Sequence, residues 1–222
     1  MRKDQIDKKP GSPEALDALK AIELDLLIHS PTEHRAYVGM SGIGGCLLKQ
    51  WLNFKFGQVP SLSGAKYGTR GYMFEANAKV RLERIGLYVP GSEMALVAPW
   101  DDRFRGHTDG ATKDGMLLEL KSIKEDAFQV VVNKDQPKPE HMAQVQTYML
   151  YGQWEACLVV YIETNTLNHW PLLVKRNTNI GVRMEQRART VLEMIDSNTP
   201  PLCECNFCRI DRRVIDSTGK LR

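Results

Sequence analysis

Two strand-like segments, residues 104–112 and 116–123, flank a Lys-Asp-Gly loop and constrain the fold of this 222-residue chain more than any other feature. Together they predict a β-hairpin. Both strands carry charged residues, and a slip of one residue in the pairing moves every side chain to the opposite face of a sheet. The register of the hairpin therefore decides which charged groups meet.

The length of the loop sets this register. A two-residue turn would place Asp109 opposite Leu120, whereas a three-residue loop with Gly115 in the left-handed conformation would place it opposite Glu119. We favour the longer loop, because it gathers Asp109, Glu119 and Lys121 on one face. Two carboxylates and an ammonium group so arranged form either a salt-bridged surface or a site for a hard metal ion, and the hairpin alone leaves both open.

Helical and strand-like patterns surround the hairpin. The predicted helices cover residues 14–28, 44–56, 67–86 and 139–151, with a last one capped by Asn179; further strands are predicted at 93–98, 157–163 and 169–175, and a loop at 61–64. This order predicts an α/β fold with a central mixed β-sheet flanked by helices. We expect one domain made of a loose lead-in (1–13), a helical N-terminal part (14–66), a core (67–175) and a C-terminal helix with a cysteine cluster (176–222).

The composition excludes several classes of protein. Hydrophobic residues make up 42% and charged residues 26%, which is typical of a globular domain and excludes a disordered tail or a disulfide miniprotein. No apolar run is long enough to cross a bilayer, and the charged N-terminus lacks the apolar stretch of a secretory signal. We therefore expect a cytoplasmic protein with no membrane partner. A net charge of +3 permits a polyanionic partner without requiring one.

Two predicted helices could complete a site at the hairpin. Gly71 and Glu75 lie four residues apart on one helical face, and the missing side chain at Gly71 leaves space beside the carboxylate. On the helix after the hairpin, His141, Gln144 and Tyr148 form a polar stripe. Each feature also has a purely structural interpretation, as an exposed glutamate and as the boundary of an amphipathic helix.

Taken in order, these elements carry a resemblance. The motifs G-x-x-x-E, G-H-x-D-G, E-x-K and Q-x-x-x-Y, spread over residues 68–148, look like those of the PD-(D/E)xK nuclease superfamily. The Q-x-x-x-Y helix resembles its RecB-like exonuclease branch, and the resemblance implies a restriction-endonuclease-like core. Many RecB-like nucleases have a histidine where this chain has Glu75, which is more similar to lambda exonuclease.

The resemblance also implies roles for single residues. Glu75, Asp109 and Glu119 would hold Mg²⁺ or Mn²⁺, with the main-chain carbonyl of Leu120 as a further ligand. Lys121 would serve the attacking water.

The remaining motif residues would serve the DNA. Gln144 and Tyr148 would contact the DNA backbone or brace the site, and His141 belongs to the same stripe. Arg70, next to Gly71, is our preferred phosphate contact. It is one of several basic residues that could line a DNA path, the others being Lys49, Lys55, Lys66, Lys124, Lys134 and Lys138.

Three of the five cysteines, Cys203, Cys205 and Cys208, lie within six residues, which indicates a metal site in a reducing compartment. Cys46 is the best-placed fourth ligand if the two ends of the chain meet, whereas Cys157 lies in an apolar run and is assigned to the core.

The arrangement of the cysteines resembles the iron–sulfur RecB-like nucleases, including the AddB nuclease domain and CRISPR-associated exonucleases. In those proteins four thiolates hold a [4Fe-4S] cluster that joins the ends of the domain. The C-x-C-x2-C spacing differs from their C-x2-C-x5-C, so a structural Zn²⁺ stays open as an alternative.

We therefore expect a metal-dependent DNA exonuclease that acts on DNA with a free end. The resemblance suggests recombination, repair or a CRISPR/phage DNA-processing pathway, with a recombination or CRISPR-type protein partner and a bacterial or phage origin. Two alternatives stay open: a structure-selective endonuclease built on the same metal core, and a non-catalytic DNA-binding module on a nuclease fold.

Overall fold

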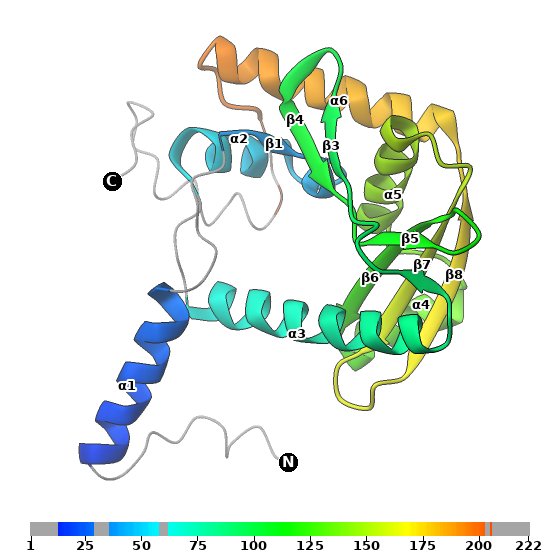
Figure 1. Cartoon of the computed structure of the whole chain (residues 1–222). Helices are drawn as coiled ribbons and strands as arrows, with labels where there is room; N and C mark the ends of the chain where they lie inside the picture. The colour runs from blue at the N-terminus through cyan, green and yellow to red at the C-terminus, as the bar shows by residue number, and fades with distance from the viewer. Residues whose placement is uncertain (1–12, 29–35, 58–61, 203–204, 206–222) are drawn as a thin grey trace.

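The computed structural model describes residues 13–28, 36–57, 62–202 and 205 (Figure 1). Its helices are α1 (Pro13–Ile28), α2 (Leu47–Phe56), α3 (Leu62–Arg84), α4 (Glu125–Lys134), α5 (Pro139–Gly152) and α6 (Thr178–Asp196), with a 3₁₀ turn at Met40–Gly42. Its strands are β1 (Val38–Gly39), β2 (Tyr88–Val89), β3 (Ala95–Ala98), β4 (Asp101–His107), β5 (Gly110–Thr112), β6 (Leu117–Ile123), β7 (Ala156–Glu163) and β8 (His169–Lys175).

The strands form two sheets. Five strands lie in the order β2-β5-β6-β7-β8, in which β6 and β7 run parallel and the other pairs antiparallel. Three more lie in the order β1-β4-β3. Helix α5 packs on one face of the larger sheet and α3 on the other, as Figure 1 shows. The predicted α/β fold with a mixed sheet flanked by helices is thus confirmed, although its strands are divided between two sheets.

The stretch 104–112, predicted as a single strand, is broken. Its first part belongs to β4 in the smaller sheet, and its last part is β5 in the larger one. Thr108 lies outside both strands. Its N–H donates to the Met94 carbonyl and its Oγ1 accepts from the Met94 N–H, both at 2.9 Å. Asp109, the next residue, therefore lies between the two sheets.

The last helix begins two residues earlier than predicted. Asn177, rather than Asn179, is the cap of α6, and its side chain accepts a hydrogen bond from the N–H of Ile180 at 3.3 Å. The main-chain N–H of Asn177 donates to Gln146 Oε1 at 2.6 Å. This tertiary contact fixes the position at which the helix starts.

Two further helical segments differ from the prediction. Helix α3 begins at Leu62, inside the predicted loop 61–64, and buries Ala65 in its first turns. Helix α4 was not predicted. It packs against the sheet through Phe128 and Val131, which are its two buried residues.

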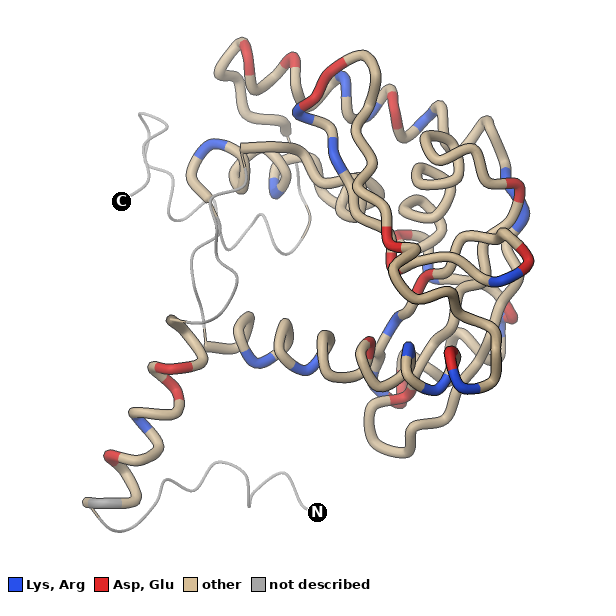
Figure 2. Tube along the Cα trace, in the orientation of Figure 1, with Lys and Arg blue, Asp and Glu red and all other residues tan. Residues whose placement is uncertain are grey.

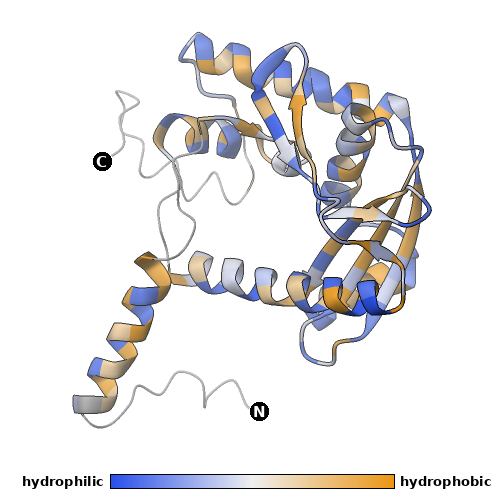
Figure 3. Ribbon diagram, viewed as in Figure 1, coloured by the Kyte–Doolittle hydropathy of each residue, from blue (hydrophilic) through white to orange (hydrophobic). Residues whose placement is uncertain are grey.

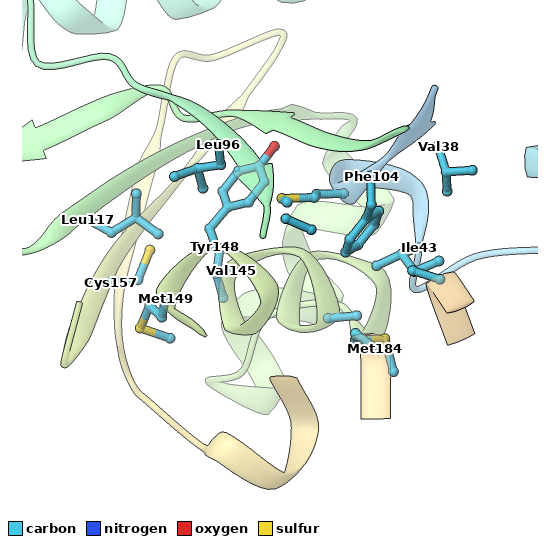
Figure 4. Close-up of a cluster of buried hydrophobic side chains, with 14 of the residues drawn as sticks. Val38, Ile43, Leu96, Phe104, Leu117, Val145, Tyr148, Met149, Cys157 and Met184 are labelled. Carbon is cyan, nitrogen blue, oxygen red and sulfur yellow. The ribbon is translucent and has the colours of Figure 1, made fainter. Parts of the chain in front are cut away.

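A hydrophobic core lies on each face of the larger sheet. The face toward α5 packs Leu117, Cys157, Val159 and Tyr161 against Val145, Tyr148 and Met149. Figure 4 shows Leu117 and Cys157 beside the residues of α5. The face toward α3 packs Leu118, Leu120, Val160 and Ile162 against Ala78. Strand β7 contributes to both cores and is hydrophobic along most of its length (Figure 3). Cys157 is fully buried, so its assignment to the core is confirmed.

Helix α1 projects from the rest of the structure and contacts the start of α3 (Figure 1), where Lys66 Nζ lies 3.0 Å from Glu23 Oε1. None of the helices within the described residues combines the length and the hydrophobicity that a membrane span requires.

Candidate active site

The β5–β6 hairpin has the register that places the two acidic residues together. Gly110 lies opposite Leu118, and the loop has three residues ending in Gly115, whose φ is 78°. One residue further along, the same register sets Asp109 opposite Glu119. The prediction of the three-residue loop is confirmed, and the left-handed conformation at its last position explains the glycine there.

Four of the predicted site residues line one open cavity of about 380 Å³ between α3 and β6. These are Glu75, Asp109, Leu120 and Lys121; the other lining residues are Gly68, Gly71, Tyr72, Ser122 and Ile162. The main-chain N–H of Leu120 donates to Asp109 Oδ2 at 2.7 Å and fixes that carboxylate at the junction between the two sheets. Three segments far apart in the sequence thus converge on the cavity.

Glu119 lies behind this cavity and is fully buried. Its Oε1 is 2.5 Å from Lys121 Nζ and accepts a hydrogen bond from Gln144 Nε2 at 2.7 Å. Its Oε2 is buried without a hydrogen-bond partner among the described residues. Burial raises the pKa of Glu119 to about 7, although the Lys121 ammonium opposes the shift.

The cavity holds more negative charge than its lysine balances. Burial raises the pKa of Asp109, and Glu75 raises it further against the opposing effect of Lys121. Burial alone would lower the pKa of Lys121, but the attraction of Glu119 and Asp109 outweighs it. Both buried carboxylates thus have raised pKa values despite the neighbouring ammonium group.

A second lysine neutralises the carboxylate on α3. Lys79 Nζ lies 2.7 Å from Glu75 Oε1 and 2.9 Å from Glu93 Oε1, which also accepts from the Tyr88 hydroxyl at 2.7 Å. Burial lowers the pKa of Lys79, but its bonds to the two glutamates raise it overall. This network was not predicted from the sequence. The spacing of four residues between Glu75 and Lys79 on a helix was the available signal.

The polar stripe of α5 faces the interior. Gln144 is 5% and Tyr148 2% exposed, so this placement favours the bracing role over a contact with DNA. His141 Nδ1 is 2.8 Å from the Tyr161 hydroxyl, and burial lowers the pKa of His141 to about 3, which keeps the imidazole neutral. A contact of any of these three residues with DNA stays a prediction.

Close packing explains why both glycines of the G-H-x-D-G motif are glycine. A Cβ on Gly106 would lie 2.7 Å from the Tyr148 ring, so only glycine lets that ring pack against β4. Gly110 has a φ of 138°, and a Cβ there would lie 2.6 Å from the Tyr88 ring. Both glycines thus allow the aromatic side chains to approach the strands on either side of Asp109.

Arg70 lies in a neighbouring cavity rather than in the acidic one. This second cavity, of about 460 Å³, also includes Lys66 and Lys124, two more of the basic residues proposed to line a DNA path.

The predicted metal ligands do not all converge. Within the described residues, no three His, Cys, Asp or Glu side chains are grouped so that they could hold a metal ion. Two of the acidic residues, Glu75 and Glu119, contact lysines instead.

The predicted cysteine cluster lies partly outside the described residues, which include Cys46 and Cys205 but not Cys203 or Cys208. Cys46 is half-buried at the N-cap of α2.

The segment before Cys46 is bound to α6. Arg187 donates to the carbonyls of Ile43 at 3.0 Å and Gly45 at 2.6 Å. Trp51 Nε1 donates to the Met194 carbonyl at 3.1 Å. The N-terminal part of the chain therefore packs on the helix that precedes the three clustered cysteines.

No protein-family model and no curated protein matches the sequence. Solved structures of similar fold exist. The structure of LHK-Exo in complex with dAMP has a TM-score of 0.60 and 16% identity, covering 84% of this chain and 97% of that one. The alkaline exonuclease LHK-Exo from Laribacter hongkongensis gives 0.53 and 15%, covering 86% and 97%. SSO0001 gives 0.56 and 15%, covering 92% and 96%. At this identity the similarity establishes the fold alone, a mixed sheet flanked by helices that this chain shares with these structures.

Proposed function

We propose that the protein is a metal-dependent deoxyribonuclease that hydrolyses phosphodiester bonds from a DNA end. The observation that carries this proposal is the cavity in which Glu75, Asp109, Leu120 and Lys121 meet, with Glu119 directly behind them. The fold shared with alkaline exonucleases supports it, as does the dAMP bound to one of them.

The residues around the cavity fit Mg²⁺ or Mn²⁺ in kind and in charge. Carboxylates and a main-chain carbonyl are the oxygen ligands that such ions prefer. Glu119 Oε2 is buried and has no donor within the described structure, and burial raises the pKa of both Asp109 and Glu119. A bound cation would give Glu119 Oε2 a partner and would stabilise the charged forms of Asp109 and Glu119. The groups that would hold the ion are the carboxylates of Glu75, Asp109 and Glu119 and the main-chain carbonyl of Leu120.

The chemistry that the ion supplies is polarisation of the scissile phosphate and activation of water. The Lys121 ammonium, held beside the cavity by Glu119, would orient the water or stabilise negative charge that develops on the phosphate. Gln144 fixes the Glu119 carboxylate through its hydrogen bond. Asp109 is fixed by the N–H of Leu120, so the acidic groups are positioned before the substrate arrives.

The test is a cleavage assay on end-labelled linear DNA with Mg²⁺ or Mn²⁺, comparing wild type with Lys121→Ala. We expect wild type to degrade the linear substrate, and the variant to be slower by about 100-fold or more. Lys175→Ala, which removes an exposed lysine from β8, serves as the control and should cleave normally.

The same assay separates the alternatives. Rapid loss of closed circular DNA would favour the structure-selective endonuclease over the exonuclease. Absence of cleavage on single- and double-stranded substrates with either ion would favour a non-catalytic DNA-binding module. We keep the recombination, repair or CRISPR/phage pathway as part of the proposal, together with Arg70 as a phosphate contact.

We also propose that Cys46, Cys203, Cys205 and Cys208 hold a [4Fe-4S] cluster or, alternatively, a structural Zn²⁺. The support is the packing of the segment before Cys46 on α6, which places one ligand near the helix that leads to the other three. Metal analysis and the visible absorption of anaerobically purified protein distinguish an iron–sulfur cluster from a zinc ion. Loss of bound metal in Cys46→Ala is expected; metal retained at full stoichiometry in that variant would refute this ligand set.

A further inference from the structure

Tyr72 is 74% exposed although it lines the cavity that holds the acidic residues. A tyrosine ring carries a large apolar surface and most often buries it. Tyr67, five residues earlier on α3, is 52% exposed and lines the neighbouring cavity. Two exposed rings beside a catalytic cleft indicate a partner with flat apolar surfaces.

The neighbouring cavity combines an aromatic ring with positive charge. Arg70 Cζ lies 4.9 Å and Lys124 Nζ 5.8 Å from the centroid of the Tyr67 ring, and Lys66 also lines this space. No carboxylate is among the described residues that line it. An aromatic ring between cationic groups is typical of sites for single-stranded nucleic acid, in which bases stack and phosphates bind the cations.

The two cavities follow each other along α3 and around the end of β6. Ser122 lines the acidic cavity and Lys124 the basic one, while on the helix Tyr67 and Gly68 are adjacent. The charges along α3 follow the same order (Figure 2): basic residues lie in its first turns, and an acidic residue follows them further along the helix. A strand bound in one cavity would therefore lead into the other.

Two glycines leave the surface of α3 between Tyr67 and Tyr72 without side chains; we call this surface the glycine floor. Gly68 and Gly71 both line the acidic cavity, and a Cβ on either would meet nothing within 4 Å in the described structure. With a rotation of about 100° per residue, they occupy the helical face between Tyr67 and Tyr72. Glycine is unfavourable inside a helix, and neither close packing nor a positive φ requires it here. The space they leave is thus available to a ligand.

We propose that this part of α3 is a track for a single polynucleotide strand. Its bases stack on Tyr67 and Tyr72, its phosphates meet Arg70 and Lys124, and its backbone passes over the glycine floor to the acidic cavity. Duplex DNA keeps its base faces stacked inside the helix, so the two rings select a single strand or a frayed end. This inference rests on the proposed nuclease function and adds the class of substrate.

The first test measures binding without cleavage. A single-stranded oligonucleotide containing 2-aminopurine, in EDTA, reports stacking by the loss of its fluorescence. We expect wild type to bind it at least about 10-fold more tightly than a blunt duplex of the same sequence. Tyr72→Ala should weaken binding by about 5- to 100-fold and lose the quenching, whereas Tyr72→Phe, which keeps the ring, should retain both.

The second test separates the track from the stability of the helix. Gly71→Ala should raise the thermal midpoint, because alanine favours helix, while it weakens binding of the single strand. Met73→Ala is the control, since Met73 is 65% exposed on the same helix and lines neither cavity. Equal affinity of wild type for duplex and single strand, or unchanged binding by Tyr67→Ala and Tyr72→Ala, would overturn the track.

The two proposals fail in different ways. Binding of the single strand with the expected response to the tyrosine variants, but no cleavage with Mg²⁺ or Mn²⁺, would remove the nuclease function and leave the track. Cleavage that is unaffected by the tyrosine variants would remove the track and leave the nuclease.

Discussion

The two faces of the five-stranded sheet are covered in different ways. On the face toward α5, every residue from 143 to 149 of the helix is buried, and Gln144 reaches the fully buried Glu119. On the face toward α3, the helix buries only Ala65 and Ala78, and it leaves a cavity of about 380 Å³ beside Glu75. The closed face fixes the orientation of the charged groups, and the open face leaves room for a substrate. The catalytic groups that we propose lie where the two faces meet.

The largest expected effect is at Asp109, which lines the open cavity at the junction of the two sheets. Asp109→Asn should slow cleavage by about 100-fold or more, because a ligand of the proposed metal loses its charge. The free energy of unfolding should stay the same or rise, since burial raises the pKa of this carboxyl and the fold therefore disfavours its charge. Cleavage rates and denaturant titrations of the same preparations measure both. A stable variant that cleaves like wild type would exclude Asp109 from the reaction.

A smaller effect is expected on the closed face. Gln144→Leu removes the hydrogen bond to Glu119 Oε1 and leaves more of a buried carboxylate unpaired. The variant should lose about 1–3 kcal/mol of unfolding free energy. Cleavage should fall as well, because Glu119 is no longer held in place. Gln129→Leu, at an exposed position of α4, is the matched control; if the two variants unfold alike, the closed face does not depend on this bond.

The smallest effect is expected at the rim of the open face. The Tyr88 hydroxyl and the Lys79 ammonium lower the pKa of Glu93 to about 2. A carboxyl with a lowered pKa stabilises the fold above its ordinary pKa of 4.5, and that contribution is lost as the pH falls toward 2.

Glu93→Gln should therefore cost up to about 1 kcal/mol at neutral pH, because the ion pair is partly exposed. The difference from wild type should shrink between pH 4.5 and 2, as measured by denaturant titration at each pH. A difference that stays constant over this range would show that the charge of Glu93 does not contribute to stability.

The sequence was sufficient for the hairpin and for most of the elements around it. The register of the hairpin was predicted because the three-residue loop gathers Asp109, Glu119 and Lys121 on one face, and the structure has that loop. Glu75 was grouped with the hairpin through the resemblance, and the structure places it in one cavity with Asp109, Leu120 and Lys121; its role as a metal ligand stays a prediction.

Other features depend on contacts that no local pattern contains. The stretch 104–112 is continuous in composition, but the structure divides it at Thr108 and Asp109, where the Thr108 Oγ1 accepts from the Met94 N–H, a contact between residues distant in the sequence. The cap of α6 was misplaced because two asparagines are suitable and a distant side chain, Gln146, selects Asn177. Helix α4 was not predicted because its valines favour a strand, whereas the packing of its buried residues stabilises a helix.

The break between β4 and β5 has a mechanical consequence. Asp109 belongs to neither sheet: its main chain connects β4 of the smaller sheet to β5 of the larger one, and its side chain accepts from the Leu120 N–H of β6 at 2.7 Å. The smaller sheet is in turn tied to the C-terminal helix, since Arg103 bridges Asp101 of β4 and Asp196 of α6. A tilt of that unit, for example on binding of another protein, would pull on Asp109 through the main chain without altering any residue that lines the cavity.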